Sequence, residues 1–247
     1  MTKKNNIKGS GVVSSVSNLV GNVADKVQNT IISIIPNQSR YTDKVQGLLN
    51  RYGKFKINNL TVCKNPVEKI INGLANALSL NEVNKQMSIN NIDALYHVFL
   101  KVEIYDVNAN QIFMVLEKNE TINLDIFNNN LITLQTQQYE IPNFVNVSFN
   151  LNSFLGNTQS QMGNSKFFNY NAIDNNCGDF VIACLKANNL YNTNITNFLV
   201  ENITFSKKAK ITKHSKSRLH LLTKVGAYVK QLRGGDIDFN NNVIRYI

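Results

Sequence analysis

Cys177 follows an Asn-rich loop and opens an apolar helical pattern, a position that suits a nucleophile. Asp174, Asn175 and Asn176 are all good N-cap residues, so the spacing predicts a helix that begins within one residue of the cysteine. The first N–H groups of a helix lack partners within the helix and the dipole there is positive, so a thiolate is stabilised. The N–H of Cys177 itself is suited to bind an oxyanion on an attacked carbonyl. Gly178 is expected to leave the approach to the sulfur open.

The residues after Cys177 predict that one side of this helix is buried. Apolar side chains recur at helical spacing and should face a core: Phe180, Val181, Cys184 and Leu185. Free cysteines are commonly buried and inert, so a structural cysteine at the start of a packed helix is the alternative interpretation.

A cysteine nucleophile needs a base, and the chain contains three histidines. His214 and His220 lie in a basic C-terminal stretch. His97 lies in residues 94–105, where β-branched and aromatic residues predict a strand. A lone histidine on a strand is often a core residue with an ordinary hydrogen bond, which is the alternative for His97.

The strand that carries His97 should form a hairpin with the next one. Residues 106–110 predict a turn and residues 111–119 a second strand. If the hairpin is centred near Asn108, His97 pairs close to Asn119 across the two strands.

In this register Glu117 lies diagonally opposite His97 on the same face of the sheet. A carboxylate or an amide beside an imidazole fixes its tautomer and supports its protonated form. A change of one residue in the register would place Lys118 and Glu120 beside His97 instead.

At these residues the sequence resembles a known group of proteins. A histidine on a strand, a polar residue on the next strand and Asn-Cys at a helix start are similar to the circularly permuted papain-like fold. That group includes the lecithin:retinol acyltransferase-like proteins and the permuted NlpC-type peptidases. Three stretches resemble a version associated with large DNA viruses, namely residues 93–100, 116–122 and 170–181.

The resemblance implies a fold and a site. The fold would be α+β, an antiparallel sheet with the cysteine-bearing helix packed on it and flanking amphipathic helices. Cys177 would be the nucleophile and His97 the base, with Glu117 ahead of Asn119 as the third member. The family more often has Gln or Glu after the cysteine, where this chain has Gly178.

Composition limits the partners and the compartment. The chain has 247 residues, 43% of them hydrophobic, which is enough for one core with flanking segments. A net charge of +10 favours an acidic partner such as nucleic acid, anionic lipid or an acidic protein. Three cysteines without framework spacing indicate a reducing compartment, and the resemblance adds a virion or host cytoplasm. Neither a metal-ligand cluster nor a phosphate loop is present, so no metal or cofactor is expected.

Three regions are predicted: an amphipathic N-terminal segment (1–40), a thiol hydrolase domain (41–205) and a basic C-terminal segment (206–247). Residues 9–36 should form an amphipathic helix, packed on protein or lying on a membrane surface, and no apolar run is long enough to cross a bilayer. Residues 206–233 contain basic residues and no acid, with an apolar stripe. This pattern is typical of a helix that binds phosphates or anionic lipid, or of a solvated helix docked on the domain.

Within the domain, the pattern predicts local elements before, between and after the site residues. These are a helix at 44–50, a strand at 55–63, a helix that begins at Pro66, a short strand at 120–124, a turn at 125–130, strands at 131–141 and 144–151, a mobile loop at 157–164 and a last core segment at 192–205. Residues 152–156 could equally start a short helix. The loop at 157–164 could line or gate a substrate cleft.

Three hypotheses for function follow. The first is a thiol hydrolase that cleaves a peptide or amide bond through a Cys177 acyl-enzyme, with His97 as general base. The second uses the same intermediate on lipid esters, as a phospholipase or acyltransferase at a membrane surface. The third is a non-enzymatic virion protein that docks on nucleic acid or capsid proteins.

Overall fold

The computed structural model describes residues 40–66, 81–119, 121–132, 134–142, 144, 149–171, 174–208 and 210. The chain divides into two units, 1–37 and 38–247, and every described residue belongs to the second. The helices predicted at 9–36 and in the basic C-terminal segment, and residues 145–148 of the strand predicted at 144–151, lie outside the described residues. Leu151, at the end of that predicted strand, begins the helix α5 instead. Within the described part, no helix is both long and apolar enough to cross a bilayer.

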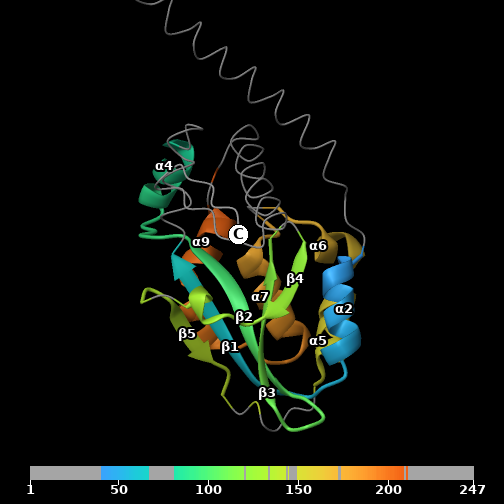
Figure 1. Cartoon of the computed structure of the whole chain (residues 1–247). Helices are drawn as coiled ribbons and strands as arrows, with labels where there is room; N and C mark the ends of the chain where they lie inside the picture. Colours follow the sequence, from blue (N-terminus) through green and yellow to red (C-terminus); the bar gives the residue numbers. More distant parts are fainter. Residues whose placement is uncertain are drawn as a thin grey trace, which may run out of the picture. The chain divides into compact units, whose positions relative to one another are not determined.

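The centre of the fold is an antiparallel sheet of five strands in the order β4-β3-β2-β1-β5 (Figure 1). The strands are β1 (Ile57–Pro66), β2 (Tyr96–Tyr105), β3 (Gln111–Lys118), β4 (Ile122–Ile126) and β5 (Gln137–Glu140). The helices of the described part are α2 (Asp43–Tyr52), α4 (Asn81–Ile89), α5 (Leu151–Met162), α6 (Asn164–Phe168), α7 (Cys177–Ala187), α8 (Thr193–Phe198) and α9 (Val200–Lys208), with a 3-10 turn η1 (Asn129–Leu131). The predicted α+β class with an antiparallel sheet is confirmed.

The helices α5 and α7 pack side by side behind the sheet in the view of Figure 1, and α7 contacts both β2 and β3. Alternate residues of the strands and one side of α7 bury apolar side chains between them. This core includes Val98, Leu100, Val102, Met114, Leu116, Phe180, Val181, Cys184 and Leu185. The opposite face carries a smaller cluster of Cys63, Phe99 and Val115.

The β2–β3 hairpin has the predicted register. Tyr105 lies opposite Gln111, which centres the hairpin on Asn108. The side chain of Asp106 accepts hydrogen bonds from the backbone N–H groups of Asn108 and Asn110, and this bonding closes the turn.

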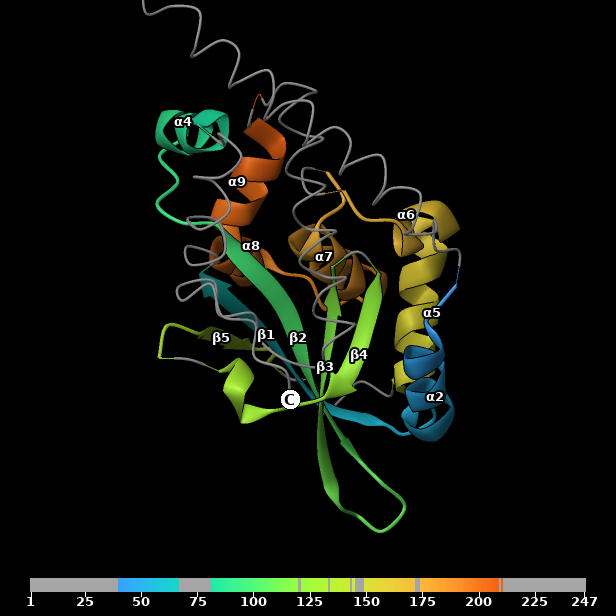
Figure 2. The same ribbon diagram turned by 45° about the horizontal axis from the view of Figure 1, so that its top comes forward.

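The strands β2 and β3 separate at the end of the hairpin that is opposite its turn. The pairing of β2 with β3 ends at Leu100 and Leu116. Beyond that point β2 stays paired with β1 as far as Tyr96, and β3 stays paired with β4 as far as Lys118. The two central strands therefore diverge toward the end at which α7 begins (Figures 1 and 2).

The loop predicted at 157–164 is wrong, because α5 continues to Met162. Asn150 caps this helix by accepting from the N–H of Ser153, while Leu151 and Phe154 are buried. Most of the polar residues at 157–162 lie on the exposed side of a helix that buries its other side, and such a side has the same composition as a loop.

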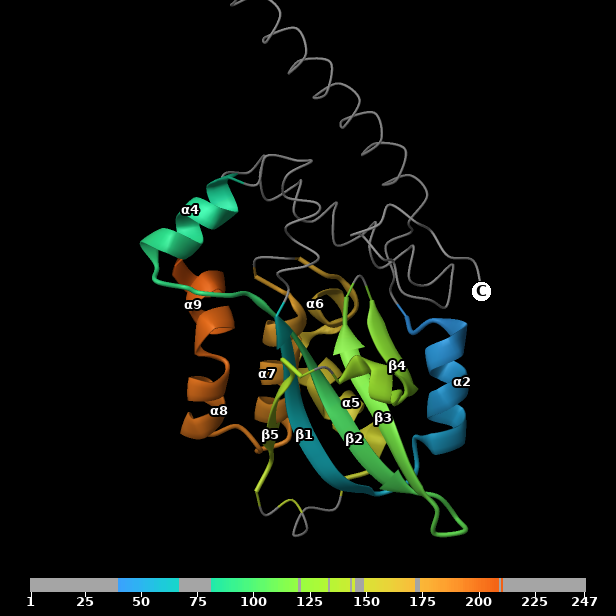
Figure 3. The ribbon, with the colours of Figure 1, turned by 60° about the vertical axis from the view of Figure 1, so that its left-hand side comes forward.

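Three predicted boundaries also need correction. Pro66 is the last residue of β1, so it does not begin the predicted helix, and residues 67–80 of that prediction lie outside the described part. The turn predicted at 125–130 is shorter, because β4 extends to Ile126. In the strand predicted at 131–141, only Gln137–Glu140 forms a strand, because η1 and a turn occupy described residues before it. β5 pairs only with β1, and Figure 3 shows it at one edge of the sheet.

Candidate active site

Asn176 is the N-cap of α7, and its side chain uses two of the free N–H groups at the start of the helix. The Oδ1 atom accepts from the N–H of Gly178 at 2.8 Å and of Asp179 at 3.1 Å. Asp179 in turn accepts from the N–H of Asn176 at 3.1 Å, which completes a capping box. The N–H of Cys177 has no acceptor among the described residues. This N–H is therefore left as a donor next to the sulfur.

His97, Glu117 and Asn119 are brought together where β2 and β3 diverge. His97 Nε2 lies 2.7 Å from Glu117 Oε2. Asn119 Nδ2 donates to the other carboxylate oxygen of Glu117 at 3.1 Å. The strands no longer pair here, so the side-chain contact between His97 and Glu117 spans the separation. The alternative register with Lys118 beside His97 is wrong.

The charge of Glu117 favours the protonated form of His97. Burial lowers the pKa of His97, but the Glu117 carboxylate, together with the neighbouring Cys177, outweighs this effect and raises it to about 10. The imidazole side chain remains 31% exposed, whereas that of Glu117 is 9% exposed. The partly exposed imidazole ring of His97 is thus hydrogen-bonded to the buried carboxylate of Glu117.

Cys177 lies at the first residue of α7, next to the start of β2. Its Sγ atom lies 4.0 Å from the carbonyl oxygen of Tyr96, the residue before His97. Cys177 is 8% exposed, while Cys63 and Cys184 are fully buried. Burial raises the pKa of both Cys63 and Cys184 to about 12. Cys177 is thus the thiol placed for chemistry.

Gly178 does not leave an open approach, contrary to the prediction. It is buried, and a Cβ atom at this position would lie 3.2 Å from Asn176 Oδ1 and 3.4 Å from Asn202 Cβ. The physical reason is that α9 packs against the start of α7. The sequence placed Asn202 only in a core segment, and nothing in its spacing signalled a contact with the site.

Lys118 lies on the second predicted strand, but its contacts with the loop before Cys177 were not predicted. It is fully buried on the helix-facing side of β3, and its Nζ donates to Asn175 Oδ1 at 3.0 Å and to the carbonyl of Lys166. Asn175 Nδ2 donates to the carbonyls of Lys166 and Asn169. The network fixes the loop before Cys177, and burial lowers the pKa of Lys118 to about 8. The alternation Met114, Leu116, Lys118 along β3 could have revealed this inward orientation.

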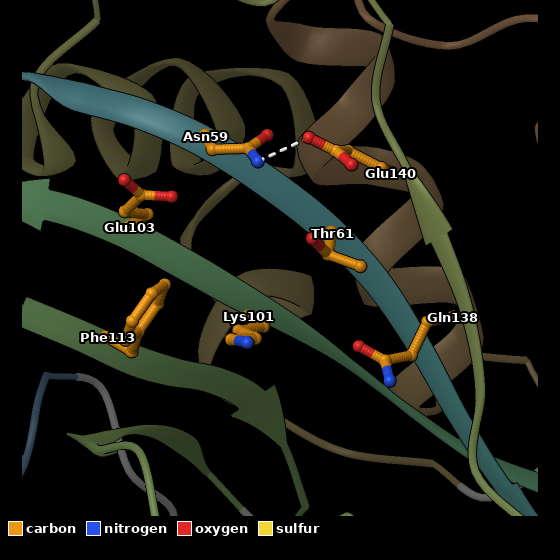
Figure 4. A pocket seen from close by; sticks show the side chains of 7 residues that line it. All are labelled: Asn59, Thr61, Lys101, Glu103, Phe113, Gln138 and Glu140. Carbon is orange, nitrogen blue, oxygen red and sulfur yellow. Dashed lines mark hydrogen bonds between the residues drawn. The ribbon is translucent and has the colours of Figure 1, made fainter.

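A pocket lies elsewhere, on the outer face of the sheet (Figure 4). Its volume is about 470 Å³, and it is lined by Asn59, Thr61, Lys101, Glu103, Phe113, Gln138 and Glu140. None of the four candidate residues lines it. Among the described residues, no group of three or more His, Cys, Asp or Glu side chains could hold a metal ion.

The geometry unites the predicted site residues, but it does not identify a family. No protein-family model, curated protein or solved structure matches the chain. The resemblance to the permuted papain-like fold therefore stays a prediction that rests on the short motifs around His97, Glu117 and Cys177.

Proposed function

We propose that the protein is a cysteine hydrolase that cleaves a peptide or amide bond through a Cys177 acyl-enzyme. The observation that carries this proposal is the 2.7 Å contact of His97 Nε2 with the buried Glu117 carboxylate. His97 lies next to Tyr96, whose carbonyl oxygen is 4.0 Å from Cys177 Sγ. The same proposal includes the permuted papain-like arrangement, because the base strand precedes the cysteine helix in the chain.

Glu117 sets the tautomer of the base. Its carboxylate accepts the Nε2–H of His97, which leaves Nδ1 to take the thiol proton. Asn119 donates to the second carboxylate oxygen and so holds Glu117 in this orientation. Because the carboxylate favours the imidazolium, proton transfer from sulfur to His97 is supported before any substrate binds.

The reaction then proceeds in two steps. The Cys177 thiolate attacks the substrate carbonyl carbon, and the Cys177 N–H stabilises the resulting oxyanion. The C–N bond breaks as His97 gives its proton to the leaving amine, which leaves a thioester. Water attacks the thioester while His97 removes its proton, and the acid is released with the thiol restored.

The test is the alkylation rate of each cysteine as a function of pH, measured by mass spectrometry on the full chain. An ordinary thiol, with a pKa of about 8.5, is mostly protonated at pH 6 and reacts slowly. We expect Cys177 to react fast at pH 6 and His97→Ala to abolish this reaction.

A rescue experiment and a clear refuting outcome complete the test. Free imidazole should restore part of the rate in His97→Ala, which separates loss of the base from loss of the fold. If Cys177 reacts at pH 6 as slowly as an ordinary thiol, the proposal is wrong. A panel of peptide, amide and ester substrates would follow a positive result.

A further inference from the structure

The carbonyl of Tyr96 occupies an unusual position in the sheet. It belongs to the part of β2 that no longer pairs with β3. The Sγ atom of Cys177 lies 4.0 Å from its oxygen. The carbonyl is therefore the point at which β2 contacts the cysteine, one residue before His97.

Asn202 on α9 supplies a donor to this carbonyl. Its Nδ2 lies 2.8 Å from the oxygen of Tyr96, the distance of a good hydrogen bond. The bond fixes the peptide group that joins Tyr96 to His97. Cys177 Sγ contacts the same oxygen at 4.0 Å, so Asn202 holds the peptide that lies between the cysteine and the base.

The oxygen of the Asn202 amide, Oδ1, helps to explain why an Asn side chain occupies this position. Asn202 is 9% exposed, and its Oδ1 has no hydrogen-bond partner among the described residues. An unpaired buried acceptor is destabilising, and an apolar side chain of similar size would avoid that penalty. The position is thus better explained by the donor end of the side chain than by packing.

Two further contacts fix α9 against the start of α7. Asn176 Nδ2 donates to Ser206 Oγ at 3.0 Å. Gly178 has no side chain, and Asn202 lies where its Cβ would make a close contact. The N-cap of the cysteine helix and the residue after the cysteine therefore both meet α9.

We propose that Asn202 is a positioning residue for the Cys177–His97 pair. It acts through Tyr96, by holding the peptide group that joins Tyr96 to His97. The inference rests on the proposed function, since it concerns the reactivity of the same sulfur.

The test compares the alkylation rate of Cys177 at pH 6 with its rate at pH 9.5 in the full chain. Asn202→Leu keeps the side-chain size and removes the donor, and Asn202→Ala is the second variant if Leu does not fold. We expect the rate at pH 6 to fall by about 10- to 100-fold, since small misplacements cost that much. The rate at pH 9.5, where an ordinary thiol ionises without a base, should change little.

Ser206→Ala is the matched control, because it loosens α9 at Asn176 and leaves the bond from Asn202 to Tyr96 in place. It should keep the wild-type ratio of the two rates. If folded Asn202→Leu or Asn202→Ala also keeps the wild-type ratio, Asn202 only packs and the inference is overturned. A slow wild-type reaction at pH 6 would instead refute the proposed function itself.

Discussion

Replacing Glu117 with Gln removes the negative charge beside His97 and keeps the size of the side chain. Two donors, His97 Nε2–H and Asn119 Nδ2, now use separate oxygens of the carboxylate. A Gln side chain offers one oxygen and places an NH₂ group at the other position. If Asn119 keeps that oxygen, the NH₂ faces Nε2 and imposes the tautomer that cannot accept the thiol proton.

The magnitude follows from the charges. The contact of 2.7 Å joins the nearest atoms of His97 and Glu117. Unit charges centred about 4 Å apart, at an effective dielectric constant of about 20, attract by about 4 kcal/mol. That energy corresponds to a change of about 1,000-fold in a protonation equilibrium, and measured effects of one neighbouring charge run from about 10-fold to that value.

We therefore expect Glu117→Gln to slow alkylation of Cys177 at pH 6 by about 10- to 1,000-fold. The pKa of His97 should fall from about 10 toward its ordinary value of 6.5, which NMR titration of the imidazole can follow. Glu103→Gln is the matched control, because Glu103 lies on the same strand as His97 and accepts a hydrogen bond from Gln111 Nε2, away from the His97–Glu117 contact.

The result that would refute this reasoning is a folded Glu117→Gln variant with the wild-type rate from pH 5.5 to pH 8. In that case the carboxylate would have no effect on His97, and the contact would be an ordinary structural ion pair. A similar loss of rate in Glu103→Gln would show a general effect of charge instead.

Three further predictions concern reactivity and stability. In the native chain Cys63 and Cys184 should resist alkylation at pH 8, because burial raises the pKa of each to about 12, and peptide mass spectrometry before and after unfolding checks this. His97 binds its proton more tightly in the folded chain, so its stabilising contribution should be complete below pH 6.5 and be lost as the pH rises through about 10. When the free energy of unfolding is measured by urea at several pH values, His97→Ala should not show this fall. A pH dependence equal to that of the wild type would contradict the prediction. Burial lowers the pKa of Lys118 from 10.5 to about 8, so its contribution should rise with pH between these values, and Lys118→Met should remove that rise in the same assay.

The sequence was sufficient for the local geometry of the site. The start of α7 followed from N-cap chemistry at Asn176, and the hairpin register followed from the turn centred on Asn108. Both depend on neighbours within a few residues or on one tight turn. That register alone placed Glu117 beside His97, because pairing across two strands repeats every two residues.

Contacts between distant segments could not be read in this way. Gly178 and Asn202 are separated by α8 and two loops, and no periodic pattern links them. The space beside Gly178 is filled by another helix, which only the tertiary packing reveals. The polar half of α5 was misread for a related reason, because exposure of one side of a helix and a solvated loop have the same composition.

The position of α9 in the chain has a consequence for synthesis. The base on β2 and the nucleophile on α7 are both made before Asn202, the residue proposed to position them. If Asn202 positions the pair, a growing chain that has completed Cys177 still lacks the contact that aligns it with His97. Full reactivity would then arise only when α9, with Asn202 near its start, has left the ribosome and docked. Under the proposed function, the enzyme would be less reactive until that point in its own synthesis.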